Sequence, residues 1–271
     1  MHPGEHGVEN KDSKRRMTQE EAELFARDAR YTTPESFRYS CCVDGREEGA
    51  DASRAVPGAD AGYFMSALAA LRESGVEVTP EVRRAVFGAV IDSVGGPKNI
   101  RFHTDLHALE KAKEKGVVAG VAAGCGHLNL ARQNPGVYGV TAEDMSAIDE
   151  ELLRLLGEDA DQKTLPGNHG EEAVMVVDDV SVGLRHQAAG SQAFVYHKGS
   201  SDAFLDQLAG AVLAKLPNHQ PGLTEEALRV KLGASFDRQL TATVNSLAPG
   251  LPQYRVSGEE VSYLGDVPKK E

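Results

Sequence analysis

The sequence lacks the surplus of basic residues and the long apolar runs that nucleic-acid-binding and membrane proteins need. Its 29 Lys and Arg residues stand against 41 Asp and Glu residues, which gives a formal net charge of −12. Because neutralising phosphates requires excess positive charge, this balance argues against nucleic acid and against an anionic membrane surface as partners. The longest weakly apolar run, residues 116–124, is far shorter than the roughly twenty residues that span a bilayer.

Cysteine is scarce as well. The chain contains 3 cysteines, and two of them, Cys41 and Cys42, are adjacent, which makes a poor disulfide framework. Residues 1–30 mix both charges without an apolar run, so they resemble neither a secretory signal nor an anchor. We therefore expect reduced thiols in a soluble, cytoplasmic protein.

Internal repeats, low-complexity tracts and the common nucleotide-binding loops are also absent. No Gly-Lys-Ser/Thr follows a glycine turn, and no GxGxxG stands between a predicted strand and a helix. The composition is 41% hydrophobic and 26% charged, which is ordinary for globular proteins and excludes general disorder.

Short β-prone runs alternate with amphipathic stretches along the chain. This alternation predicts an α/β fold with a central, mostly parallel sheet flanked by helices. We divide the chain into an N-terminal arm and helix (1–30), an α/β domain (31–216) and a small C-terminal α+β extension (217–271). Strands are predicted at 37–43, 53–56, 99–103, 173–178 and 192–197, helices at 18–29, 62–74, 79–94, 105–115, 141–156, 201–216 and from 224, and a hairpin between 254–256 and 261–264.

The segment CVDGR, residues 42–46, is the richest in chemistry. Cys42 ends a predicted strand, where a thiolate can project into the crevice in which α/β sheets bind ligands. Asp44 points to the same side if the chain stays extended, and Arg46 can reach back to it with two hydrogen bonds. An Asp held by Arg stays ionised and only accepts hydrogen bonds, which suits a position beside a metal-bound hydroxide. The alternative interpretation is a buried cysteine followed by a turn with a surface ion pair.

A second candidate segment is GCGH, residues 124–127, which precedes a predicted helical start. Cys125 and His127 share a turn flanked by glycines and can face one ion, because glycine permits the backbone conformations that such a turn needs. With Cys42 they supply two thiolates and one imidazole. This set fits a zinc ion with its fourth position open, the arrangement of catalytic zinc sites.

Other histidines and one glycine turn complete the candidates. His103, at the end of a predicted strand, is a possible ligand, proton shuttle or surface residue. We interpret His186 and His197, near the 192–197 strand, as solvated or paired. Gly58 and Ala59 lie in a turn that leads into a helix, whose free N–H groups can hold an anion such as bicarbonate, although a plain strand–helix connection is the alternative.

The CVDGR segment resembles the CxDxR motif of β-class carbonic anhydrases, and RAVPGA, residues 54–59, resembles the strand and glycine turn that follow it in that family. The resemblance covers roughly residues 37–135 and implies a β-carbonic-anhydrase-like fold for the α/β domain. It implies that Cys42 ligates zinc and that Asp44 and Arg46 orient the zinc-bound water.

The second ligand segment departs from the family pattern. The family has His-x-x-Cys, whereas this chain has Cys125-Gly126-His127, in reversed order and with shorter spacing. Carried over residue by residue, Cys125 would be the second thiolate ligand. The imidazole would come from His127, which shares its turn with Cys125, or alternatively from His103.

The resemblance implies a zinc-dependent lyase that hydrates carbon dioxide reversibly to bicarbonate by means of a metal-bound hydroxide. Three alternatives stay open: the same fold and metal acting on another small heterocumulene or ester, a catalytically inactive metal-binding or scaffold protein, and nucleophilic chemistry by Cys42. The resemblance also implies a homodimer or higher homo-oligomer, and we expect the 18–29 helix to expose Leu24 and Phe25 as a contact surface.

Overall fold

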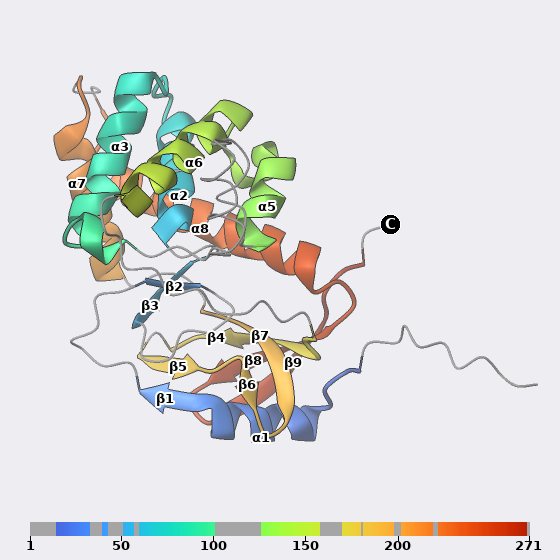
Figure 1. Cartoon of the computed structure of the whole chain (residues 1–271). Helices are drawn as coiled ribbons and strands as arrows, with labels where there is room; N and C mark the ends of the chain where they lie inside the picture. Colours follow the sequence, from blue (N-terminus) through green and yellow to red (C-terminus); the bar gives the residue numbers. More distant parts are fainter. Residues whose placement is uncertain are drawn as a thin grey trace, which may run out of the picture.

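The computed structural model describes residues 15–32, 40–42, 51–56, 60–100, 126–157, 170–179, 181–197, 202–218 and 222–269. It confirms a mixed α/β architecture, in which a five-stranded sheet lies between α1 on one face and a group of helices on the other (Figure 1). The helical elements are α1 (Gln19–Ala29), α2 (Asp60–Glu73), α3 (Pro80–Ser93), η1 (Pro97–Asn99), α5 (Gly126–Gln133), η2 (Pro135–Tyr138), α6 (Ala142–Gly157), α7 (Asp202–Lys215) and α8 (Glu225–Leu247).

Threonine N-caps begin several of the described helices, among them α1, α3 and α8. Thr18 caps α1 and forms the predicted capping box with Glu21, in which each side chain accepts a backbone N–H of the other residue. Thr79 caps α3, whose first turn contains a proline, and Thr224 caps α8. These local signals explain why the predicted starts of the three helices agree with the structure.

The strands in the described part of the chain form one five-stranded sheet and two strand pairs. In the order β6-β7-β4-β8-β9, β4 is parallel to β7 and β8, whereas β6 and β9 are antiparallel hairpin partners. The sheet is therefore mixed, and parallel only at its centre. The strands are β1 (Arg30–Thr32), β2 (Ser40–Cys42), β3 (Asp51–Val56), β4 (Ala173–Val177), β5 (Val182–Leu184), β6 (Gln187–Ala188), β7 (Ser191–His197), β8 (Pro252–Ser257) and β9 (Glu260–Asp266).

The two faces of the sheet contribute to two separate cores. Val174 and Val176 of β4 pack with the helices of the larger layer, whereas Met175 and Val177 pack with α1. This division follows from the period of two in a strand, which directs successive side chains to opposite faces. The uninterrupted apolar run of β4 is thus the result of burial on both faces.

Helix α1 exposes less apolar surface than expected. Phe25 is fully buried, because it lies with Ala22, Ala26 and Ala29 on the helix face that packs against the sheet. The expectation that Phe25 is exposed is therefore wrong. Leu24, on another face of the helix, is 39% exposed.

The segment 217–271, which we expected to form a small extension, supplies part of the central sheet and of the larger core. Its strand β8 pairs in parallel with β4, and its helix α8 packs along α2. Buried leucines of α8 belong to the same core as α2 and α3. The predicted hairpin is confirmed by the pairing of Val256 with Val261.

The region around residue 100 differs from the sequence prediction. Asn99, where a strand was predicted to begin, lies in the 3₁₀ turn η1, which starts at Pro97. The rest of that strand and the helix predicted at 105–115 lie outside the described residues. No helix among those that the structure describes is long and apolar enough to cross a membrane.

Candidate functional site

The predicted site falls only partly on described elements. Cys42 is the last residue of β2, and His127 lies in the first turn of α5. Within the described ranges, no group of three or more His, Cys, Asp or Glu side chains could hold a metal ion. Because Cys125 lies outside those ranges, the ligand set of Cys42, Cys125 and His127 stays a prediction. The remaining predicted site residues lie outside the described residues: Asp44, Arg46, Gly58, Ala59, His103 and Cys125.

The parallel pair of β2 and β3 ends at the two segments of interest. Cys42 pairs with Val56, and these are the last residues of their strands. The segment CVDGR and the turn with Gly58 and Ala59 therefore begin at neighbouring carboxyl ends of parallel strands, which is where α/β proteins bind ligands. Strand β3 also contacts α2, β5 and β7, which agrees with its place between the helices and the large sheet in Figure 1.

Helix α2 follows that turn and is the central helix of the larger core. It begins at Asp60, directly after Ala59, and every residue from 61 to 71 is buried. Because α2 packs against α3, α6 and α8, its first turn is held in a fixed place. The N–H groups of a helix start that cannot shift are a suitable place for an anion.

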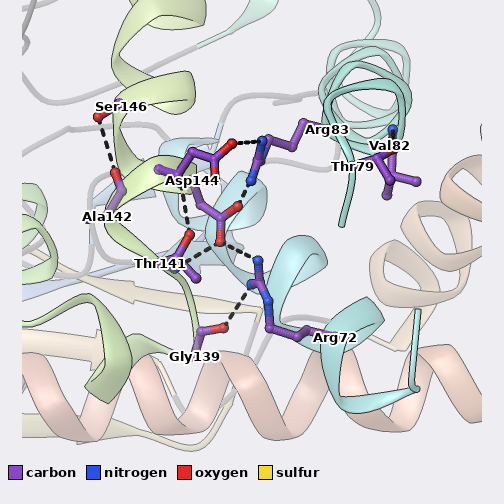
Figure 2. A network of polar contacts seen from close by, with 10 residues as sticks. Arg72, Thr79, Val82, Arg83, Gly139, Thr141, Ala142, Asp144 and Ser146 are labelled. Atoms are coloured by element: carbon purple, nitrogen blue, oxygen red, sulfur yellow. Dashed lines mark hydrogen bonds and ion pairs between the residues drawn. The ribbon is translucent and has the colours of Figure 1, made fainter. Parts of the chain in front are cut away.

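An ion-pair network fixes α2 relative to α3 and α6. Figure 2 shows the carboxylate of Asp144, on α6, between Arg72 of α2 and Arg83 of α3. Arg83 Nε donates to Asp144 Oδ1 over 2.9 Å, Arg72 Nη2 lies 2.8 Å from Oδ2, and the Thr141 backbone N–H donates to Oδ2 over 2.8 Å. Burial raises the pKa of Asp144, but these donors outweigh it and hold the pKa below its usual value.

Helix α5, which contains His127, is held by two buried apolar residues and by an ion pair with α6. Leu128 and Ala131 are fully buried in the larger core. Arg132 donates through Nε to Asp149 Oδ2 over 2.8 Å and through Nη2 to Asp149 Oδ1 over 2.5 Å. The two side chains are only 15% and 6% exposed, so α5 is bound to α6 by a bidentate pair that is largely shielded from water.

One unusual residue was not recognised in the sequence. His197 ends β7 opposite Val177, is 3% exposed, and its Nδ1 has no hydrogen-bond partner among the described residues. The interpretation that His197 is solvated is therefore wrong. The signal was present, because His197 follows Ala193 and Val195 at the period of two that places all three on one buried face.

Burial of His197 predicts a loss of stability in mild acid. Burial lowers its pKa from 6.5 to about 4, against a smaller opposing effect of Asp179. Between these values the unfolded chain binds the proton and the native protein does not, so stability falls as the pH falls from 6.5 to 4. We expect protonation of His197 to lower the free energy of unfolding by about 3 kcal/mol over this pH range. Urea unfolding of the wild type and of His197→Leu between pH 6.5 and 4 tests this prediction. The free energy of unfolding should fall more in the wild type than in the variant. An equal fall in both proteins would show that His197 does not cause the loss.

Comparisons with known proteins do not assign the chain to a family. No family model, curated protein or solved structure matches it.

Proposed function

We propose that the protein is a zinc-dependent, carbonic anhydrase-like lyase that hydrates carbon dioxide reversibly to bicarbonate, on the β-carbonic-anhydrase-like fold that its CVDGR motif implies. The observation that carries this proposal is the parallel pairing of Cys42 with Val56. It brings the start of CVDGR beside the start of the turn with Gly58 and Ala59. The proposed reaction requires a metal-binding motif close to an anion-binding turn, and the paired residues Cys42 and Val56 are the last described residues before these segments continue.

The donor set fits zinc. Cys42, Cys125 and His127 offer two thiolates and an imidazole, with His103 as the alternative imidazole, and zinc favours these donors over the carboxylate and carbonyl oxygens that calcium and magnesium require. A zinc ion with one open position supplies a water molecule whose pKa is lowered to about 7.

The other residues have distinct tasks in this proposal. Asp44 accepts a hydrogen bond from the attacking water and so directs the oxygen lone pair toward carbon dioxide. Arg46 holds the Asp44 carboxylate in that direction through a bidentate pair. The backbone N–H groups at Gly58 and Ala59, before α2, hold the bicarbonate product as an anion.

Zinc content and carbon dioxide hydration of the purified wild-type protein test this function. We expect about one zinc per chain and hydration that a chelator abolishes. Zinc without hydration would favour another small heterocumulene as the substrate. Protein without zinc or hydration would refute the proposal and favour a scaffold role.

We also propose that the protein forms a homodimer through α1. Leu24 is 39% exposed beside a groove of about 720 Å³ between α1 and the β8–β9 turn. An antiparallel copy of α1 would bring the two exposed Leu24 side chains together, with Arg27 of each copy near Glu20 and Glu21 of the other.

Light scattering tests this dimer. We expect the wild type to have the mass of a dimer and Leu24→Glu that of a monomer, because a charge would be buried at the centre of the interface. Val230→Glu is the matched control, since Val230 is 57% exposed on α8, far from α1 in the sequence, and should leave the dimer intact. A wild-type mass of one chain at every concentration would exclude the dimer.

A further inference from the structure

The face of the sheet that α1 covers has a small core of its own. The buried residues of this small core come mainly from α1 and from the strands β4, β7 and β8, whereas the helices on the other face pack in the larger core. On α1 the buried side chains are Phe25 and three alanines, Ala22, Ala26 and Ala29. Because the sheet lies between the two cores (Figure 1), α1 can separate from the sheet while the larger core stays packed.

The other contacts of α1 are weak. The helix has 11 residues, and an isolated helix of that length is marginal in water. Two ion pairs at its start, Arg15 with Glu172 and Arg16 with Asp266, involve arginine side chains that are 53% and 47% exposed. Ion pairs with this much exposure contribute little to stability. We therefore expect α1 to open at a lower free energy than the helices of the larger core.

His197 lies on the face of the sheet that α1 covers. It ends β7 opposite Val177, whose side chain belongs to the small core, and it is 3% exposed. Its Nδ1 is buried without a hydrogen-bond partner among the described residues. Because burying an unpaired charge is costly, the closed form of the protein favours the neutral imidazole.

A carboxylate connects His197 with the end of α1. Asp179, which follows β4, interacts electrostatically with both His197 and Arg30, and Arg30 is the C-cap of α1. Asp179 Oδ1 accepts hydrogen bonds from the Ser181 backbone N–H over 2.9 Å and from the Ser181 hydroxyl over 2.7 Å, which fix the carboxylate in its turn. A charge on His197 would therefore compete with Arg30 for a carboxylate that is already hydrogen-bonded.

The other charged groups on neighbouring elements are placed differently. Asp178 and Arg255 lie 3.4 Å apart, and Arg255 is on the face of β8 opposite to that of its two neighbours in the small core. Arg185 is exposed, and His186 lies beside the start of β7, whereas His197 is at its end. Among the described residues, Asp179 is thus the charged group that faces His197.

We propose that His197 is an acid-sensitive switch for α1, whose protonation favours an open form in which α1 separates from the sheet and water reaches the imidazole. The closed form buries the neutral side chain, and the open form accommodates the charged one. Burial lowers the pKa of His197 from 6.5 to about 4 in the closed form, so the open form binds the proton first as the pH falls. This switch does not depend on the proposed activity.

The carboxylates that hold the start of α1 keep their charge over the same pH range. Hydrogen bonds from Thr18 hold the pKa of Glu21 below its usual value of 4.5, and a hydrogen bond from Arg16 holds that of Asp266 below its usual value of 3.8. Both side chains therefore remain mainly ionised between pH 6.5 and 4.5. An opening of α1 in this range points to His197 and not to these ion pairs.

Hydrogen exchange at pH 7 and pH 4.5, corrected for the intrinsic exchange rates, tests the switch. We expect the equilibrium constant for opening of α1 to rise roughly 50-fold in the wild type, because opening is coupled to the binding of one proton. Amides of α2 should stay more protected than those of α1 at both pH values. In His197→Leu the opening constant of α1 should change less than about threefold, because no proton is bound at this position.

Two further variants complete the experiment. His197→Gln, which is polar but does not titrate, makes the same test if His197→Leu does not fold. His186→Leu is the matched control, because it removes a partly exposed histidine and should behave like the wild type. An opening constant that does not rise in the wild type, or that rises equally in His197→Leu, would overturn the switch. Equal opening constants for α1 and α2 at both pH values would also overturn it, because acid would then act on the whole fold and not on α1.

Discussion

Asp44→Ala is expected to keep its zinc and to lose carbon dioxide hydration by roughly two to three orders of magnitude, the usual effect of removing a positioning polar group from an active site. Zinc is retained because Asp44 is not one of the proposed ligands. Arg46→Ala should also retain zinc but lose activity, since the Asp44 carboxylate would then be free to swing toward the metal and close its open position. Zinc analysis and hydration rates of both variants provide the measurement.

A surface ion pair supplies the matched control for this experiment. Asp206 and Arg229 lie 3.2 Å apart and are 54% and 31% exposed. Exposed pairs of this kind contribute about 0–1 kcal/mol, so Asp206→Ala should leave hydration unchanged. If Asp44→Ala also hydrated carbon dioxide at the wild-type rate, Asp44 and Arg46 would form only a surface ion pair, and the proposed mechanism would be wrong.

Asp144→Ala is expected to have the largest effect on stability, a loss of about 3–5 kcal/mol, because it leaves two arginines without their shared counter-charge. The Asp144 side chain is fully buried, and those of Arg83 and Arg72 are 8% and 33% exposed (Figure 2). Urea unfolding at neutral pH measures the loss.

Glu143→Ala provides the comparison, because Glu143 also binds Arg83 but is 72% exposed. Its loss should cost no more than about 1 kcal/mol. Equal effects of the two substitutions would show that the network does not owe its strength to the burial of Asp144.

The helices were predictable where the sequence carries local signals. Thr18 and Glu21 define the start of α1, and the order Thr79-Pro80 defines the start of α3, because capping satisfies N–H groups that the helix leaves unpaired. The β8–β9 hairpin was predictable for a similar reason, since its strands are joined by a short turn at Gly258.

The order of the strands could not be predicted in the same way. The parallel neighbours of β4 are not adjacent to it in the sequence. No local sequence pattern predicts that Val256 of β8 pairs with Val177 of β4. For this reason the segment from 217 onward looked like an extension, although its strand β8 completes the sheet. The burial of His197, in contrast, follows from its place at a period of two after Ala193 and Val195, which share a buried face of β7.

The sequence motifs identify the residues of the candidate site, but they do not predict the contacts that hold the surrounding strands and helices in place. The spacing of Cys42, Asp44 and Arg46 is visible in the sequence, whereas the pairing of Cys42 with Val56 required the structure. The contact between Arg132 and Asp149 joins two helices through side chains that look like ordinary surface charges in the sequence. Charged residues are rarely buried unless they are paired. The sequence alone does not show which acidic residue pairs with Arg132.

The central claim, that Cys42 and Cys125 hold a zinc ion, is tested most directly by the zinc content of Cys42→Ser and Cys125→Ser. Cys41→Ser is the matched control, because Cys41 is adjacent to Cys42 and is not a proposed ligand. We predict about one zinc per chain in the wild type and in Cys41→Ser, and almost none in the other two variants, since a serine hydroxyl does not replace a thiolate ligand. Full zinc occupancy in both Cys42→Ser and Cys125→Ser would contradict the proposed site.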